Sequence, residues 1–133
     1  MNMSSHLPRI HMIDVEADRL TQMANNLERR EPELAALLLG EIERAQTHEP
    51  GNLPAGVVNM GAYVEFVDEG NGVYHTLQLV YPQDADITAG RLSVLTHVGA
   101  GLIGLSEGDS IVWPDRGGNE RRLRIVRVIN RAH

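Results

Sequence analysis

The fold is decided by the stretch Leu92-Ser-Val-Leu-Thr-His-Val-Gly-Ala-Gly-Leu-Ile-Gly-Leu-Ser-Glu-Gly-Asp-Ser-Ile-Val-Trp113. Within it, Gly99, Gly101 and Gly104 spell G-x-G-x-x-G after an apolar run, as in a dinucleotide-binding loop. That chemistry needs the glycines to open a crossover helix inside a βαβ unit of roughly 30 residues. Here the turn signal Gly108-Asp109 comes only four residues after Gly104, whereas a parallel crossover takes at least about ten residues. The spacing therefore argues against a nucleotide site.

The same stretch indicates a strand, one short helix over 98–105, a turn and a second strand, followed by a loop and a final strand. From Ser93 to Ile111 its residues follow the pattern S-V-x-x-x-x-G-x-G-L-I-G-x-x-x-G-D-x-I. This order and this pattern resemble the C-terminal domain of the GreA/GreB transcript-elongation factors. The resemblance runs from about residue 13 to 128, and it is specific mainly over 57–128. In this interpretation Gly101, Gly104 and Gly108 serve backbone geometry.

In the residues on either side of this stretch, apolar residues alternate with polar ones, and this period of two predicts an antiparallel β-sheet. We expect strands at 57–60, 62–67, 74–81, 91–95, 110–113 and 121–129. Only one short helix is available to cover this sheet, so the predicted class is α+β with one covered face. In the last strand Leu123 and Ile125 share one face, while Val126 and Val128 share the other. A β-bulge between Ile125 and Val126 would restore their burial.

Toward the N-terminus, apolar residues recur with a period of about 3.6 residues. This spacing predicts two helices joined as an antiparallel hairpin, a short coiled coil. Asp14 can cap a first helix that ends near Leu27, and Pro32 opens a second helix that runs to about Ala45. The sequence thus divides into a disordered tail (1–12), the hairpin (13–46), a linker rich in proline and glycine (47–56) and a β-rich domain (57–131).

Three histidines are candidates for metal binding or catalysis. His6 and His11 could suggest a metal site, but a disordered tail does not orient ligands as a working site requires. His97 falls at a strand-to-helix corner, where we expect a surface or capping residue rather than a base. The sequence therefore predicts no metal site, no cofactor and no catalytic residue.

The composition excludes several classes of protein. The chain of 133 residues has a formal net charge of −6 and no lysine, which argues against binding to nucleic acid or to a specific DNA sequence and suits docking onto a basic protein surface. The arginines of the final strand are expected to form a solvated face. Cysteine is absent, so there is no disulfide or thiolate site. Because no long apolar run is present, we expect a cytoplasmic protein without a membrane partner.

The resemblance implies a fold and a docking site. The β-rich domain would be FKBP-like and would make the main contact with RNA polymerase through Leu95, Thr96, His97 and Val98. An FKBP-like fold also suggests a peptidyl-prolyl isomerase, which needs a pocket with aromatic walls. The chain has one Trp, one Phe and three Tyr, and we assign these to core and strand packing instead.

The resemblance also gives the hairpin tip a role. In GreA and GreB a long helical hairpin enters the secondary channel of RNA polymerase, and its tip carboxylates help to hold a catalytic Mg²⁺ for transcript cleavage. The candidate tip here carries Glu28, Glu31 and Glu33, and it lacks the acidic stretch of the Gre pattern. Arg29 and Arg30 lie among these glutamates and reduce the negative electrostatic potential that a cation would experience there. Helices of about 14 residues span only about 21 Å, so this tip should stop short of the active centre.

The resemblance, together with the short and charge-balanced tip, implies a non-enzymatic regulator that binds RNA polymerase at the secondary channel, competes with Gre factors there and does not stimulate cleavage. Two alternatives stay open. One is a Gre-type cleavage factor. The other is a regulator of nucleoside diphosphate kinase acting through protein–protein contact, because the chain is also similar to the short-hairpin Rnk group, which is named for that role.

Overall fold

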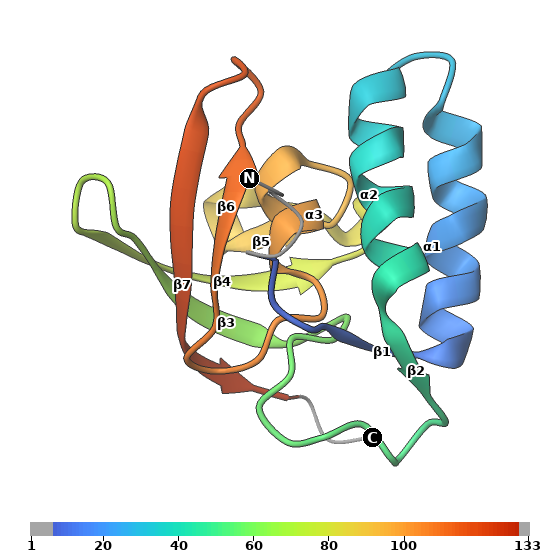
Figure 1. Cartoon of the computed structure of the whole chain (residues 1–133), viewed down its shortest axis with the longest axis horizontal. Coiled ribbons are helices and arrows are strands. Elements are labelled where there is room, and N and C mark those ends of the chain that lie inside the picture. The colour runs from blue at the N-terminus through green and yellow to red at the C-terminus, as the bar shows by residue number, and fades with distance from the viewer. Residues whose placement is uncertain (1–6, 131–133) are drawn as a thin grey trace.

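The computed structural model describes residues 7–130, and these confirm the predicted α+β class. The elements are β1 (His11–Ile13), α1 (Asp14–Leu27), α2 (Pro32–Arg44), β2 (Gln46–His48), β3 (Tyr63–Asp68), β4 (Val73–Val80), β5 (Arg91–Ser93), α3 (His97–Leu102), β6 (Ser110–Pro114) and β7 (Glu120–Ile129). A curled five-stranded sheet lies on one side of the molecule and the hairpin of α1 and α2 on the other, with α3 between them (Figure 1).

The helical hairpin agrees with the sequence prediction to within about a residue at each end. Pro32 stands at the start of α2, where its missing N–H leaves no hydrogen bond unmade. Between the helices, the N–H groups of Arg30 and Glu31 both donate to the carbonyl of Leu27. The predicted cap was wrong. Ile13 is the N-cap residue, and Asp14 begins the helix with its carboxylate accepting from the N–H of Val15 at 2.6 Å.

Residues 7–12 differ from the expected disordered tail, because their apolar side chains enter the core. Ile10 and Met12 are buried, and β1 pairs in parallel with β2. The N–H of His11 donates to the carbonyl of Gly104 at 3.1 Å, which ties β1 to the β-rich domain. The alternation of Ile10 and Met12 was the missed signal. Since β2 runs to His48, the irregular linker begins two residues later than expected, and His6 lies outside the described residues.

The sheet has the order β5-β4-β3-β7-β6 and is mixed, so the expected fully antiparallel sheet was wrong at one edge. β5 runs parallel to β4, with Gln78 beside Arg91. The segment between them contains two 3-10 turns, Pro82–Asp84 and Ile87–Ala89, which carry the chain back before β5 starts. The predicted strand at 57–60 is also absent as a strand, since Val57 makes only a single bridge with Ser106.

The predicted β-bulge in the last strand is confirmed. Glu65 of β3 faces Arg127 of β7, whereas the next residue, Phe66, faces Ile125, so Val126 is the extra residue. The bulge places Leu123, Ile125 and Val128 in the core together.

One continuous core joins the hairpin to the sheet. Side chains from both helices, the sheet and α3 belong to the same buried cluster, which includes Leu20, Leu34, Leu38, Phe66, Leu79, Leu102, Ile111 and Trp113. The hairpin therefore lies along the domain instead of standing free of it, and α2 contacts α3 (Figure 1). Among residues 7–130, no helix has the length and apolar character needed to cross a membrane.

Candidate functional site

The predicted docking segment, Leu95–Val98, forms the corner between β5 and α3. Thr96 is the N-cap of α3, and its hydroxyl accepts from the N–H of Gly99 at 3.0 Å while donating to the carbonyl of Ser93 at 2.8 Å. The N–H of Leu95 donates to the hydroxyl of Ser93 at 3.0 Å. These bonds fix the backbone of the corner, because a cap satisfies donors that the helix leaves open.

Two glycines of the G-x-G-x-x-G spelling allow close packing around this corner. A Cβ atom on Gly99 would lie 2.3 Å from the carbonyl oxygen of Ser93, and one on Gly101 would lie 2.8 Å from Cδ1 of Trp113. Gly104 has a φ of +86°, a conformation that side chains disfavour. The glycines are therefore explained by packing and backbone geometry, and Thr96 accepts hydrogen bonds from the amides of Gly99 and Ala100 in α3.

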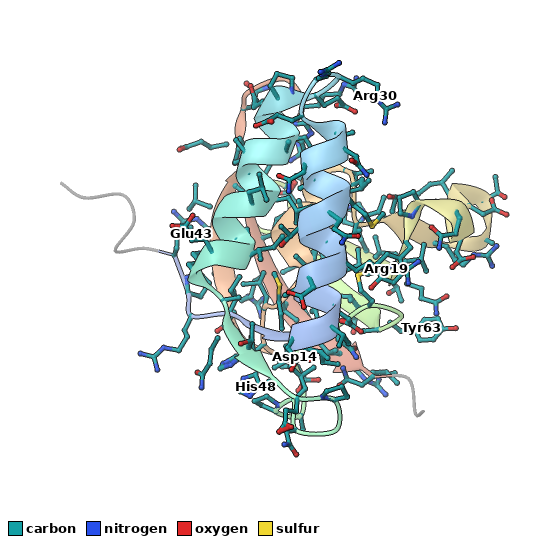
Figure 2. The ribbon with its side chains drawn as sticks, turned by 90° about the vertical axis from the view of Figure 1, so that its right-hand side faces the viewer. Asp14, Arg19, Arg30, Glu43, His48 and Tyr63 are labelled. Atoms are coloured by element: carbon teal, nitrogen blue, oxygen red, sulfur yellow. The ribbon has the colours of Figure 1, made fainter. Side chains whose placement is uncertain are left out.

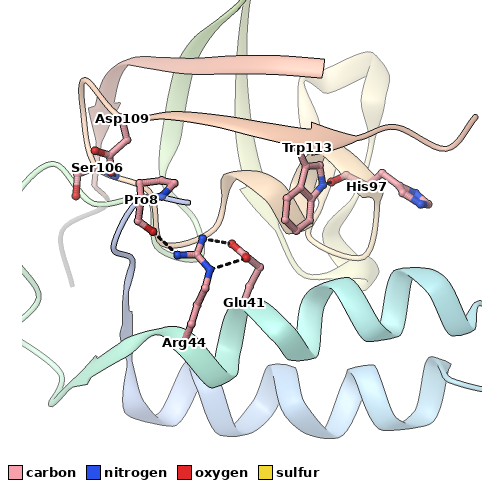
Figure 3. A network of polar contacts seen from close by, with 7 residues as sticks. All are labelled: Pro8, Glu41, Arg44, His97, Ser106, Asp109 and Trp113. Carbon is pink, nitrogen blue, oxygen red and sulfur yellow. Dashed lines mark hydrogen bonds and ion pairs between the residues drawn. The ribbon is translucent and has the colours of Figure 1, made fainter. Parts of the chain in front are cut away.

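His97 is the first residue of α3 and contacts β6 and α2, so it is neither the surface residue nor the capping residue expected from the sequence. Its carbonyl accepts a hydrogen bond of 2.6 Å from Nε1 of Trp113 on β6 (Figure 3). Only 11% of its side chain is exposed, and Nε2 lies 3.7 Å from Oε1 of Glu33 at the start of α2. Leu95 and Val98 are partly buried against the core. The docking segment consequently presents only partly exposed side chains.

The hairpin tip lies at the far end of the two helices. Glu28 is exposed, Glu31 is half-buried, and the side chain of Glu33 is 70% exposed. Arg30 marks this end of the hairpin in Figure 2. The contact between Glu33 and His97 connects one member of the predicted tip to one member of the predicted docking segment.

An ion pair within α2, between buried Glu41 and Arg44, was not predicted from the sequence. Glu41 is 3% exposed, and its two carboxylate oxygens accept from Nε and Nη2 of Arg44, each at 2.8 Å. Nη1 of Arg44 donates to the carbonyl of Pro8, so the pair also anchors the segment before β1 (Figure 3). Burial raises the pKa of Glu41, and Arg44 acts in the opposite direction. The spacing of Glu41 and Arg44, one helical turn apart, was the available signal.

The arginines of β7 are partly neutralised by acids on neighbouring strands and loops. Arg121 lies 3.2 Å from the buried carboxylate of Asp68 and 3.7 Å from Asp115. Arg124 lies 3.3 Å from Glu69. These pairs support the prediction of a solvated strand face over a nucleic-acid patch.

The mixed sheet, the glycine-rich helix α3 and the helical hairpin together define a domain of the type found in transcription elongation factors. Residues 53–130 match the family model described as "Transcription elongation factor, GreA/GreB, C-term". The chain therefore belongs to the GreA/GreB family, as its sequence pattern indicated.

The relatives extend this similarity to the hairpin. The chain is 33% identical over 121 residues to "Regulator of nucleoside diphosphate kinase" from Escherichia coli K12, covering 91% of this chain and 89% of the relative. It is 40% identical to GreA from Alkalilimnicola ehrlichii over 67% of this chain but only 56% of that factor. A solved GreA/GreB structure from Nitrosomonas europaea superposes with a TM-score of 0.71 at 35% identity, covering 93% of this chain and all of that one.

Proposed function

We propose that this chain is a regulator that binds RNA polymerase at the entrance of the secondary channel, where it competes with Gre factors without stimulating transcript cleavage. Family membership supports the polymerase as partner. The observation that carries the rest of the proposal is the length of the hairpin. α1 and α2 have 14 and 13 residues, which corresponds to about 20 Å.

The chemistry of the tip supports obstruction over cleavage. A catalytic Mg²⁺ requires carboxylates that are free to approach it. Arg29 and Arg30 lie between Glu28 and Glu31 and lower the negative potential there. Glu33 faces His97 on the domain. The tip therefore lacks an undivided acidic cluster at the end of a projecting arm.

The docking segment would act mainly through its shape and backbone. Thr96 is engaged as a cap and His97 is covered by α2, so Leu95 and Val98 supply the partly exposed side chains. As at the rims of most protein interfaces, this surface would govern the orientation of the chain on RNA polymerase and its association rate more than its total affinity.

Neutralising the tip should change little. In Glu28→Gln/Glu31→Gln/Glu33→Gln, we expect the chain to stay folded and to compete with Gre factors as the wild type does. Charges that are not buried and lie near a helix terminus contribute only about 0.3–1 kcal/mol each. Circular dichroism and a transcript-cleavage assay on backtracked complexes would measure both properties. Wild-type cleavage activity that disappears in the triple variant would instead identify a true cleavage factor.

A second candidate function is contact with nucleoside diphosphate kinase, favoured by the name of a relative that aligns over 91% of this chain. A pull-down from bacterial lysate with the full chain separates the two partners. We expect RNA polymerase subunits to be retained, and the protein would then act in the cytoplasm. Retention of the kinase without polymerase would support the second candidate and contradict the first.

A further inference from the structure

His11 on β1 and His48 at the end of β2 bring their imidazole rings together at the open end of the hairpin. Nδ1 of His11 lies 3.0 Å from Nε2 of His48, and the ring centroids are 5.1 Å apart. His48 lies at the opposite end of the hairpin from Arg30 (Figure 2). The parallel pairing of β1 with β2 fixes both backbones. The two imidazole rings are therefore held in a fixed orientation, which a disordered tail would not provide.

The distance between the rings suits two nitrogen ligands on one metal ion. Nitrogen ligands about 2.0–2.1 Å from a tetrahedral Zn²⁺ lie roughly 3.3 Å apart. Ring movements of a few tenths of an ångström would take the observed 3.0 Å to that value. Both side chains are half-buried, so an ion can reach them from solvent.

Two charged residues lie within electrostatic range of His11. Arg9, which is exposed, would repel a cation, whereas Asp109 would attract one.

We propose that His11 and His48 form a two-histidine site for a divalent transition-metal ion of the Zn²⁺ type. In the part of the chain that the structure describes, no group of three His, Asp or Glu side chains gathers around a point. Water would complete the coordination, so the ion is exchangeable and not a permanent structural component. When bound, it links β1 to β2 and strengthens the attachment of the N-terminal strand. Imidazole ligands do not suit Mg²⁺, which prefers oxygen.

Calorimetric titration and thermal unfolding of the full chain test this site with ZnCl₂ and MgCl₂ as probes. We expect one Zn²⁺ per chain, a raised Tm with Zn²⁺ and no change with Mg²⁺. His11→Gln and His48→Gln should each weaken Zn²⁺ binding at least about tenfold, the minimum loss seen when even supporting groups of metal sites are removed. His75→Gln is the matched control, because His75 stacks on Phe66 in the five-stranded sheet, whereas His11 and His48 belong to the separate pair of β1 and β2. The Zn²⁺ affinity of this variant should match the wild type.

Two results would overturn the site. One is a wild-type chain whose Tm and heat of titration do not respond to Zn²⁺. The other is unchanged Zn²⁺ affinity in both His11→Gln and His48→Gln, with circular dichroism showing that each variant is folded. In either case the pair is a hydrogen-bonded contact alone. Neither measurement involves RNA polymerase, so the outcome is independent of the proposed transcriptional function.

Discussion

Arg44→Met is expected to lower the free energy of unfolding by about 3–5 kcal/mol at pH 7, because removing one partner of a buried ion pair leaves the other charge uncompensated. The carboxylate left behind is that of Glu41, which is 3% exposed. The carbonyl of Pro8 also loses its donor. Urea unfolding monitored by circular dichroism measures the loss.

The loss should shrink in acid. The pKa of Glu41 is already raised in the folded protein by burial, and removal of Arg44 raises it further. An acid whose folded pKa lies above its unfolded value destabilises the fold as the pH rises between the two values. The deficit of Arg44→Met relative to wild type should therefore be largest at pH 7 and decline toward the ordinary glutamate pKa of 4.5.

The double variant Glu41→Met/Arg44→Met is the control for this result. Replacing both partners of a buried pair by apolar side chains is often neutral or stabilising, so the double variant should recover most of the stability and show less pH dependence. A loss below about 1 kcal/mol in Arg44→Met, the range of exposed pairs, would contradict the account of this ion pair.

Gly101→Ala is expected to cost about 1–3 kcal/mol, the usual effect of adding a methyl group to a filled core. The new Cβ would lie 2.8 Å from Trp113, whose indole is held by the carbonyl of His97. Fluorescence of this single tryptophan in urea unfolding would measure both the packing change and the stability.

Gly40→Ala is the matched control. Gly40 lies inside α2 with nothing within 4 Å of an added Cβ, so alanine there should stabilise the chain by about 0.5–1 kcal/mol through helix propensity. If Gly101→Ala were as stable as Gly40→Ala, close packing would not explain the glycine at position 101.

Local patterns in the sequence predicted local structure well. The helix bounds followed from apolar spacing and from Pro32, and the bulge at Val126 followed from the change of face along the last strand. Both depend on neighbours within a few residues, which a sequence displays directly.

Features that depend on distant partners were missed. β1 exists because β2 and Gly104 supply its hydrogen bonds, and neither lies near it in sequence. β5 is parallel because two short turns redirect the chain, where an antiparallel neighbour was expected. The contact of His97 with Glu33 arises only when α2 packs on α3. The contact of the docking segment and of the hairpin tip with RNA polymerase stays a prediction.

One variant connects the docking segment to the proposed activity. Leu95→Glu places a charge in the segment without removing the Thr96 cap. We expect weaker competition for RNA polymerase, mainly through slower association, because charge at a rim changes encounter rates. Circular dichroism must show that the variant is folded, since Leu95 is partly buried.

The central claim is tested most directly by GreA-stimulated transcript cleavage in stalled, backtracked RNA polymerase complexes, measured with increasing amounts of the wild-type chain. We expect cleavage to fall as the chain saturates the polymerase, and the chain alone to stimulate none. Unchanged GreA-dependent cleavage at saturating amounts of the chain would contradict competition at the secondary channel, and cleavage stimulated by the chain alone would contradict its assignment as a non-cleaving regulator.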